Sequence, residues 1–243
     1  MENLEEKLFD INKVPRRAGL LIFGISLSRI SNAQSAEKCF EYMQHFIPKI
    51  IKPEVGLNIV YGDSLYMNSS EKARDLKKKF EPLIHNHKYG FMKLLEKNPI
   101  YIQKSFNFVT WADMILESKE FFSYLSNLKK IYEKDEIFQT FVQKDIESNN
   151  PKEEEIEFIL EEILMFYLTT KGKIRLKNEF VQEKHKWILW CYPGKPLYSE
   201  VYLYNKNFFK LDNPENIYQN SFYDLESRKL YDHTKIKVED LLK

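Results

Sequence analysis

The sequence of 243 residues contains little of the material from which several common sites are built. It has only 7 glycines and neither a G-x-G-x-x-G nor a G-x-x-x-x-G-K-[ST] motif, so a glycine-rich phosphate loop is not predicted. Its 2 cysteines, Cys39 and Cys191, lie far apart and form no C-x-x-C pair. This cysteine usage indicates reduced thiols and argues against a disulfide framework.

Long apolar runs and an excess of either charge are also missing. No run of about 18 apolar residues occurs, and the first residues lack the basic and then apolar pattern of a signal peptide. Lys and Arg number 37 against 36 Asp and Glu, so any argument for nucleic acid has to rest on local clusters. We expect a soluble cytoplasmic monomer without membrane contact, folded as one domain over residues 1–243.

Apolar runs at residues 19–26 and 55–62 predict two buried parallel strands, and the segment between them has helical spacing. Such a strand-helix-strand unit places its functional turns at the carboxyl ends of the strands. The fold class predicted is α/β, with a mainly parallel sheet flanked by helices. The last forty residues show no clear periodicity and carry no prediction. The remaining expected elements are a helix over 69–97, a strand within 98–109, helices near 110–132, 135–147 and 152–170, and a strand stopped by Pro193.

Two serines at predicted strand ends are candidate nucleophiles. Ser64 lies in "GDSL", which matches the start of a serine esterase, whereas Ser26 closes the run "GLLIFGIS". An esterase of that type needs a late Asp-x-x-His to activate its serine, and none of the 5 histidines has Asp three residues before it. His85 and His87 would lie about 200° apart on a helix, which does not suit a shared metal ion, so no metal site is predicted.

Five further segments follow one another along the chain: "LIFGISLSR", "NIVYGD", "SEKARDLKKKF", "FILEEILMFYLTT" and "WCYPGKPLYSEVYLY". Their order and approximate spacing resemble those of the tRNA-dependent cyclodipeptide synthases. The resemblance covers most of residues 19–204. It implies a Rossmann-like domain similar to the catalytic domain of class I tyrosyl- and tryptophanyl-tRNA synthetases. It also implies an enzyme without a cofactor, which joins two aminoacyl groups from charged tRNAs into a diketopiperazine through a ping-pong acyl-serine intermediate.

The same resemblance implies roles for individual residues. Ser26 would accept the first aminoacyl group, Glu162 would hold and later deprotonate the substrate amine, and Tyr192 would orient Ser26. Arg29, Tyr192 and Pro193 look like the subfamily that has a variable residue, Tyr and Pro. Asp63 falls at the family's second strand end. The first aminoacyl pocket would be lined by Ile22, Gly24, Met165 and Trp190. The tRNA phosphates would meet the basic cluster of Lys72, Arg74, Lys77, Lys78 and Lys79.

One position departs from the family, which normally has tyrosine where this sequence has Phe158. A catalytically weakened aminoacyl-tRNA-binding protein is therefore an alternative, and a serine hydrolase that uses Ser64 is another. The basic cluster also fits a solvated helix face, and Glu162 also fits a solvated charge beside Glu161. The sequence has no His-x-Gly-His and no Lys-Met-Ser-Lys-Ser, the signatures by which class I synthetases handle ATP, so we expect no activation of free amino acids. The resemblance implies that two aminoacyl-tRNAs are the substrates.

Overall fold

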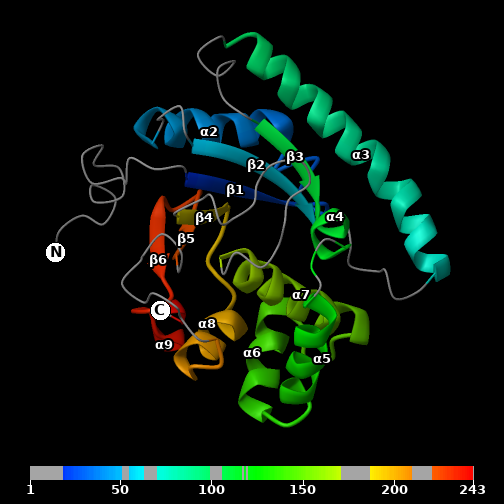
Figure 1. Cartoon of the computed structure of the whole chain (residues 1–243), viewed down its shortest axis with the longest axis vertical. Helices are drawn as coiled ribbons and strands as arrows, with labels where there is room; N and C mark the ends of the chain where they lie inside the picture. Colours follow the sequence, from blue (N-terminus) through cyan, green and yellow to red (C-terminus); the bar gives the residue numbers. More distant parts are fainter. Residues whose placement is uncertain are drawn as a thin grey trace. The chain divides into compact units, whose positions relative to one another are not determined.

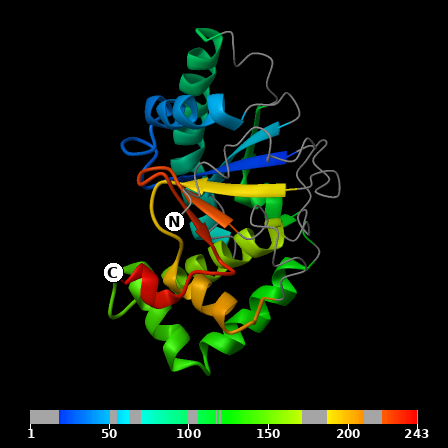
Figure 2. The ribbon, with the colours of Figure 1, turned by 90° about the vertical axis from the view of Figure 1, so that its left-hand side faces the viewer.

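The computed structural model describes residues 19–50, 55–62, 70–98, 106–116, 118, 120–170, 187–209 and 221–242. Six strands form a mainly parallel sheet flanked by helices, which confirms the predicted α/β fold class (Figures 1 and 2). The chain divides into two compact units, Met1–Ala112 with Lys184–Trp187, and Asp113–Glu183 with Ile188–Lys243. The single domain expected from the sequence stays a prediction.

The first unit contains three parallel strands in the order β3-β2-β1 (Figure 1). The apolar runs of the sequence became β1, Gly19–Ser26, and β2, Val55–Gly62, with the bounds predicted. The third strand, β3, covers Phe106–Thr110. The connecting helices are α2, Ala36–Ile50, and α3, Ser70–Glu96.

Helix α3 covers one face of these strands with aromatic side chains. The Phe91 ring of α3 meets the rings of Phe106 and Phe108 edge to face, at 6.2 and 5.9 Å between centroids. Tyr61 of β2 points to the same side, with its hydroxyl oxygen 2.9 Å from Nδ1 of His87. Burial lowers the pKa of His87, so its imidazole is held neutral beside the tyrosine. This face of the three strands therefore packs against α3.

The second unit combines a helical bundle with the other strands of the sheet. Strands β4, Trp187–Tyr192, and β5, Ser221–Asp224, are parallel, and β6, Lys229–Asp232, is antiparallel to β5. Helix α7, Glu153–Thr170, is buried on all sides from Ile163 onward, as expected of a central helix. It lies beside α5 and α6 in both views (Figures 1 and 2). The other helices are α4, Trp111–Leu116, α5, Phe121–Tyr132, α6, Glu136–Ile146, α8, Tyr198–Asn205, and α9, Val238–Leu241.

One expectation about the elements needs correction, and one region without a prediction contains regular structure. The helix predicted near residues 110–132 is two helices, α4 and α5, because a bond from Ser118 N to Ile115 O (3.0 Å) closes the first as a turn. The apolar spacing continues across this break, since both helices bury their apolar faces. The last forty residues contain β5, β6 and α9. Strand β5 shows no alternation of exposed and buried positions, because all four of its residues are buried.

Glu161 is buried in α7, although the sequence pattern suggested no such position. Only 5% of its surface is exposed. Burial, reinforced by the negative charge of Glu157 and opposed by Lys129, raises the pKa of Glu161 to about 8. Glu157 itself is paired with Lys129 of α5, at 2.6 Å between Oε1 and Nζ. Glu161 is therefore protonated at neutral pH, unlike an exposed glutamate.

The raised pKa makes the stability of the protein depend on pH. Between the ordinary value of 4.5 and about 8, folded Glu161 keeps a proton that the unfolded chain releases. The free energy of unfolding should therefore fall as pH rises through this window, by at most about 1.4 kcal/mol per pH unit. We predict that Glu161→Gln removes this part of the pH dependence and makes the variant more stable than the wild type above pH 8.

Chemical denaturation at a series of pH values measures this effect. Glu153→Gln, at an exposed position in the first turn of the same helix, is the matched control and should follow the wild-type curve. Parallel curves for the wild type and Glu161→Gln would contradict the assignment of a raised pKa to Glu161.

Candidate active site

Ser26 is the last residue of β1 and is partly exposed at the carboxyl end of the strand. Its Oγ lies 2.9 Å from Oγ of Ser28. Among the residues that the structure describes, no histidine and no carboxylate is hydrogen-bonded to this hydroxyl. Ser26 therefore has a fixed position at a strand end, and the side chain beside it is another hydroxyl, which is no strong base.

Gln34 holds the backbone of the last residues of β1. Its Nε2 donates to Gly24 O (2.7 Å), and its Oε1 accepts from Ser26 N (2.8 Å). The side chain is buried, and the turn that carries it is closed by bonds from Arg29 N to Ser26 O (3.0 Å) and from Gln34 N to Arg29 O (2.9 Å). Sequence reasoning missed Gln34, because a glutamine eight residues beyond a strand end is too common to be a signal.

In the second unit, Asp224 fixes the turn that follows Tyr192. Tyr192 is the last residue of β4, and its carbonyl oxygen accepts from Leu225 N at 3.0 Å. The carboxylate of Asp224 accepts from Gly194 N at 2.9 Å, and also from Ser227 Oγ at 2.5 Å. Gly194 has φ of 130°, a conformation that residues with a Cβ rarely adopt. The conformation of the turn after Tyr192 is thus set by Asp224, which lies among the last forty residues, where no element was predicted.

Helix α7 carries two of the predicted site residues one turn apart. Phe158 and Glu162 are both half-buried on this helix, and the spacing of four residues places them on one face. Met165, predicted to line the first aminoacyl pocket, is fully buried, and its carbonyl oxygen accepts from Thr169 Oγ1 at 2.5 Å. Trp190 of β4 is buried too, with its ring 6.2 Å from that of Phe166.

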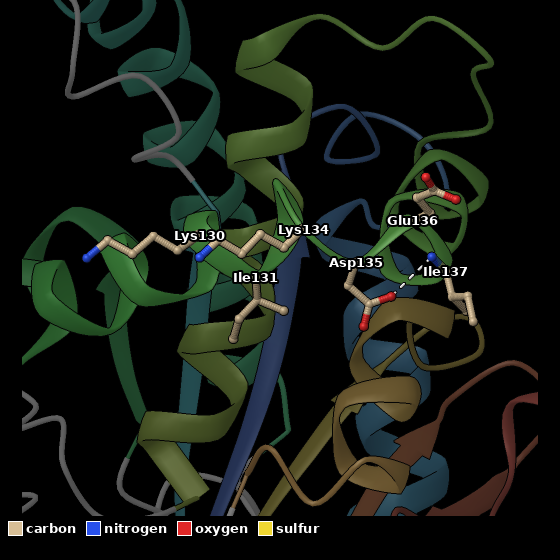
Figure 3. Close-up of a pocket in the computed structure, with 6 residues that line it drawn as sticks. All are labelled: Lys130, Ile131, Lys134, Asp135, Glu136 and Ile137. Carbon is tan, nitrogen blue, oxygen red and sulfur yellow. Dashed lines mark hydrogen bonds between the residues drawn. The ribbon is translucent and has the colours of Figure 1, made fainter.

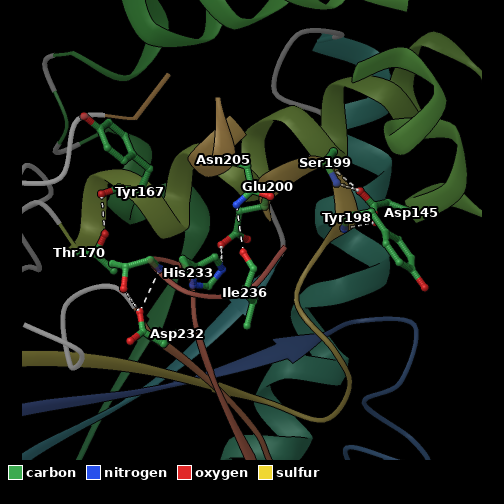
Figure 4. A network of polar contacts seen from close by, with 11 residues as sticks. Asp145, Tyr167, Thr170, Tyr198, Ser199, Glu200, Asn205, Asp232, His233 and Ile236 are labelled. Atoms are coloured by element: carbon green, nitrogen blue, oxygen red, sulfur yellow. Dashed lines mark hydrogen bonds and ion pairs between the residues drawn. The ribbon is translucent and has the colours of Figure 1, made fainter. Parts of the chain in front are cut away.

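Asp145 of α6 caps the start of α8, the helix that contains all but the first two residues of the "PLYSEVYLY" segment (Figure 4). Its two oxygens accept from the backbone N–H groups of Tyr198 (2.7 Å) and Ser199 (2.9 Å), and it is also hydrogen-bonded to the Ser199 hydroxyl. Burial raises the pKa of Asp145 to about 6 against the opposing effect of these bonds. The cap therefore holds the start of α8 against α6.

A buried pair of ionisable groups follows on the same helix. Glu200 Oε1 lies 2.7 Å from His233 Nε2, and both side chains are almost fully removed from solvent (Figure 4). The imidazole is flanked by the rings of Phe166 and Tyr204, at 4.8 and 4.9 Å between centroids. The glutamate of the "PLYSEVYLY" segment thus has a structural partner in the final part of the chain.

The structure describes the other predicted residues only in part. Ile22 and Gly24 share one face of β1 with Ser26, and Arg29 lies exposed in the following turn. Lys78 and Lys79 are exposed on α3. Outside the described residues or side chains lie Asp63, Ser64, Lys72, Arg74 and Lys77.

A surface pocket lies elsewhere, where α5 passes into α6, and Figure 3 shows its lining. Asp135 in this lining caps α6 by accepting from Ile137 N (3.1 Å) and Phe138 N (3.0 Å). None of the predicted site residues lines the pocket. In the part of the chain that the structure describes, no helix is long and apolar enough to span a membrane, and no three ligands gather for a metal ion. The lining consists of Lys130, Ile131, Lys134, Asp135, Glu136 and Ile137.

Comparison with known proteins gives a result at the level of structure alone. No family profile and no curated protein sequence matches the chain. A cyclodipeptide synthase from Fluoribacter dumoffii superposes with a TM-score of 0.56 at 16% identity, over 84% of this chain and 87% of that one. The chain has the cyclodipeptide synthase fold. Identity this low transfers the cyclodipeptide synthase architecture but assigns no residue.

Two further cyclodipeptide synthases agree with this result. The enzyme from Staphylococcus haemolyticus has a TM-score of 0.53 at 14% identity, covering 85% of this chain and 88% of its own. A Mycobacterium tuberculosis protein has a TM-score of 0.52 at 12% identity, covering 87% and 84%. Its structure is described as demonstrating that cyclodipeptide synthetases are related to type I tRNA synthetases. The fold expected from the five sequence segments is therefore confirmed.

The position of Ser26 should depend on Gln34. We predict that Gln34→Met lowers the free energy of unfolding by about 1–3 kcal/mol, because it leaves Ser26 N and Gly24 O without their partner. Gln44→Met, the same change at an exposed position of α2, should cost less than about 0.5 kcal/mol. Chemical denaturation measures both. Equal effects of the two substitutions would show that Gln34 does not hold the strand end.

Proposed function

We propose that this protein is an aminoacyltransferase that joins the aminoacyl groups of two aminoacyl-tRNAs into a cyclic dipeptide. The observation that carries the proposal is Ser26, held by Gln34 at a strand end of a cyclodipeptide synthase fold. The hydroxyl of Ser28 is the group beside it. A serine without a strong base reacts poorly with amides or ordinary esters, whereas the ester of an aminoacyl-tRNA is already activated.

The first step is acylation of Ser26. Its Oγ attacks the carbonyl carbon of the aminoacyl ester, the bond from that carbon to the ribose oxygen breaks, and the serine proton passes to the ribose oxygen. The tRNA leaves with a free hydroxyl, and the amino acid stays on Ser26 as an ester. Tyr192 orients Ser26 and assists this proton transfer, the role that the sequence resemblance implies.

Two further transfers complete the cycle. The ammonium of the acyl-serine loses a proton, and the free amine attacks the ester carbon of a second aminoacyl-tRNA. A dipeptidyl-serine forms, the bond to the ribose oxygen breaks, and that oxygen takes a proton from the attacking nitrogen as the second tRNA leaves. The amine at the free end of the dipeptide then attacks the serine ester, closes the six-membered ring, and returns a proton to Ser26 Oγ. Glu162 holds the ammonium form of the amine and accepts its proton before each attack.

Transfer RNA would bind through α3. Lys78 and Lys79 are exposed on this helix and offer point charges to phosphates, and we propose the same role for Lys72, Arg74 and Lys77. Such contacts position the acceptor end without reading its bases.

A covalent mechanism leaves an acyl group on the protein, which can be measured. With a radiolabelled amino acid on its tRNA, wild-type protein should carry label after denaturation, and Ser26→Ala should lose both label and cyclic product. Ser64→Ala and Ser28→Ala should keep the label. A label that survives Ser26→Ala but disappears in Ser28→Ala would place the nucleophile on the neighbouring hydroxyl and contradict the proposal.

Phe158 supports a second candidate function, a relative that binds aminoacyl-tRNA with weakened catalysis, because it lacks the hydroxyl expected at this position. If the absence of this hydroxyl limits how well the substrate amine is positioned, Phe158→Tyr should preserve or increase the yield of cyclic product, measured by mass spectrometry. A large loss of product would show that the site is built around phenylalanine. Binding of charged tRNA without acylation in the wild type would establish the second function instead.

A further inference from the structure

Two neighbouring asparagines on the strands of the first unit have buried amide atoms that make no hydrogen bond to the described residues. Asn58 of β2 is fully buried, and among the described residues neither its Oδ1 nor its Nδ2 has a hydrogen bond. Asn107 pairs with Asn58 in the register of β2 and β3, and its Nδ2 is also buried and unpaired. Each such group costs about 1–3 kcal/mol when left unsatisfied. Three together indicate a site that a polar group fills.

The amides lie on the same face of the sheet as Ser26. Asn58 pairs with Ile22 of β1, and side chains alternate along a strand, so Ile22, Gly24 and Ser26 share its side. The opposite side carries Tyr61, whose hydroxyl meets His87 of α3. Packing against α3 therefore does not account for the two asparagines.

An acyl group on Ser26 would have to extend along β1 to reach Asn58. Ile22, at the level of Asn58, precedes Ser26 by four residues, which is about 13 Å along the strand at about 3.3 Å per residue. Gly24 lies between them, partly exposed and without a side chain. Only a long side chain of the acyl group could therefore approach Asn58.

We infer that the first aminoacyl group has a long, uncharged side chain whose tip both donates and accepts hydrogen bonds, such as the carboxamide of glutamine or the phenol of tyrosine. This inference rests on the proposed function. Asn58 Oδ1 needs a donor, and the two Nδ2 groups need an acceptor. A hydrocarbon leaves all three unpaired, a carboxylate offers no donor, and an ammonium offers no acceptor.

The test compares tRNAs charged with similar amino acids that differ at the tip, tyrosine against phenylalanine and glutamine against methionine. The rate of acylation of the wild-type protein should favour the polar member of at least one pair by about 100-fold or more, because sites built to hydrogen-bond a side chain reject analogues without it. The pair that shows the preference identifies the tip as phenol or carboxamide. Asn58→Leu should reduce that preference to less than about 10-fold.

Stability provides a second measurement that needs no substrate. Asn58→Leu should preserve or raise the free energy of unfolding, because it replaces an unpaired buried amide by an apolar side chain of similar size. The matched control is Asn205→Leu, since the Asn205 amide donates to Ile236 O (3.0 Å) and accepts from Val238 N (3.3 Å). That control should lower the free energy of unfolding by about 1 kcal/mol and leave the acylation preference unchanged.

The outcomes separate this inference from the proposed function. Faster acylation by phenylalanine and methionine than by their polar counterparts would overturn the inference and leave the acyltransferase intact. A preference unchanged in Asn58→Leu, or a loss of stability as in Asn205→Leu, would also overturn it by showing that the amide serves the fold. Absence of acylation with every charged tRNA would overturn the proposed function, and the inference with it.

Discussion

Alternation of side chains across β1, β2 and β3 is the constraint on which the first unit depends. Every second residue of these parallel strands has to pack under helices, and the rings of Tyr61, Phe106 and Phe108 meet that demand. The residues between them face the other side of the sheet, where Ile22, Asn58 and Val60 are fully buried as well. Gly24, Ser26 and the unpaired amide of Asn58 share this second face. The candidate chemistry therefore lies on the face of the strands that does not meet α3.

Both candidate strand ends are fixed in the same physical way, although they belong to different units. Gln34 bonds to the backbone of Gly24 and Ser26, and Asp224 bonds to the backbone of Gly194 just beyond Tyr192. Gln34 makes two hydrogen bonds to main-chain groups at the end of β1, and Asp224 makes one to the main chain two residues beyond Tyr192. The candidate side chain is then positioned by its own backbone and needs no direct contact with the group that holds it.

The parts of the fold that follow from the sequence are those with a local cause. Strands β1 and β2 are unbroken apolar runs, and α7 ends at Thr170, just before Lys171 and Gly172, so their bounds could be read directly. Gln34, Asp224 and Glu161 could not be found in this way, because their roles arise from partners distant in the chain or from burial. The assignment of Ser26 came from a resemblance of short segments, which local periodicity alone does not supply.

The bond from Gly194 N to Asp224 joins residues thirty positions apart. During synthesis on the ribosome, the turn after Tyr192 therefore cannot take its final form until the strand that ends at Asp224 has emerged and paired with β4. The first unit's strand end has no such delay, because Gln34 follows Ser26 by only eight residues. One strand end can thus form early in translation and the other only after Asp224 has been synthesised, so a growing chain passes through a stage in which the serine is in place and the tyrosine is not.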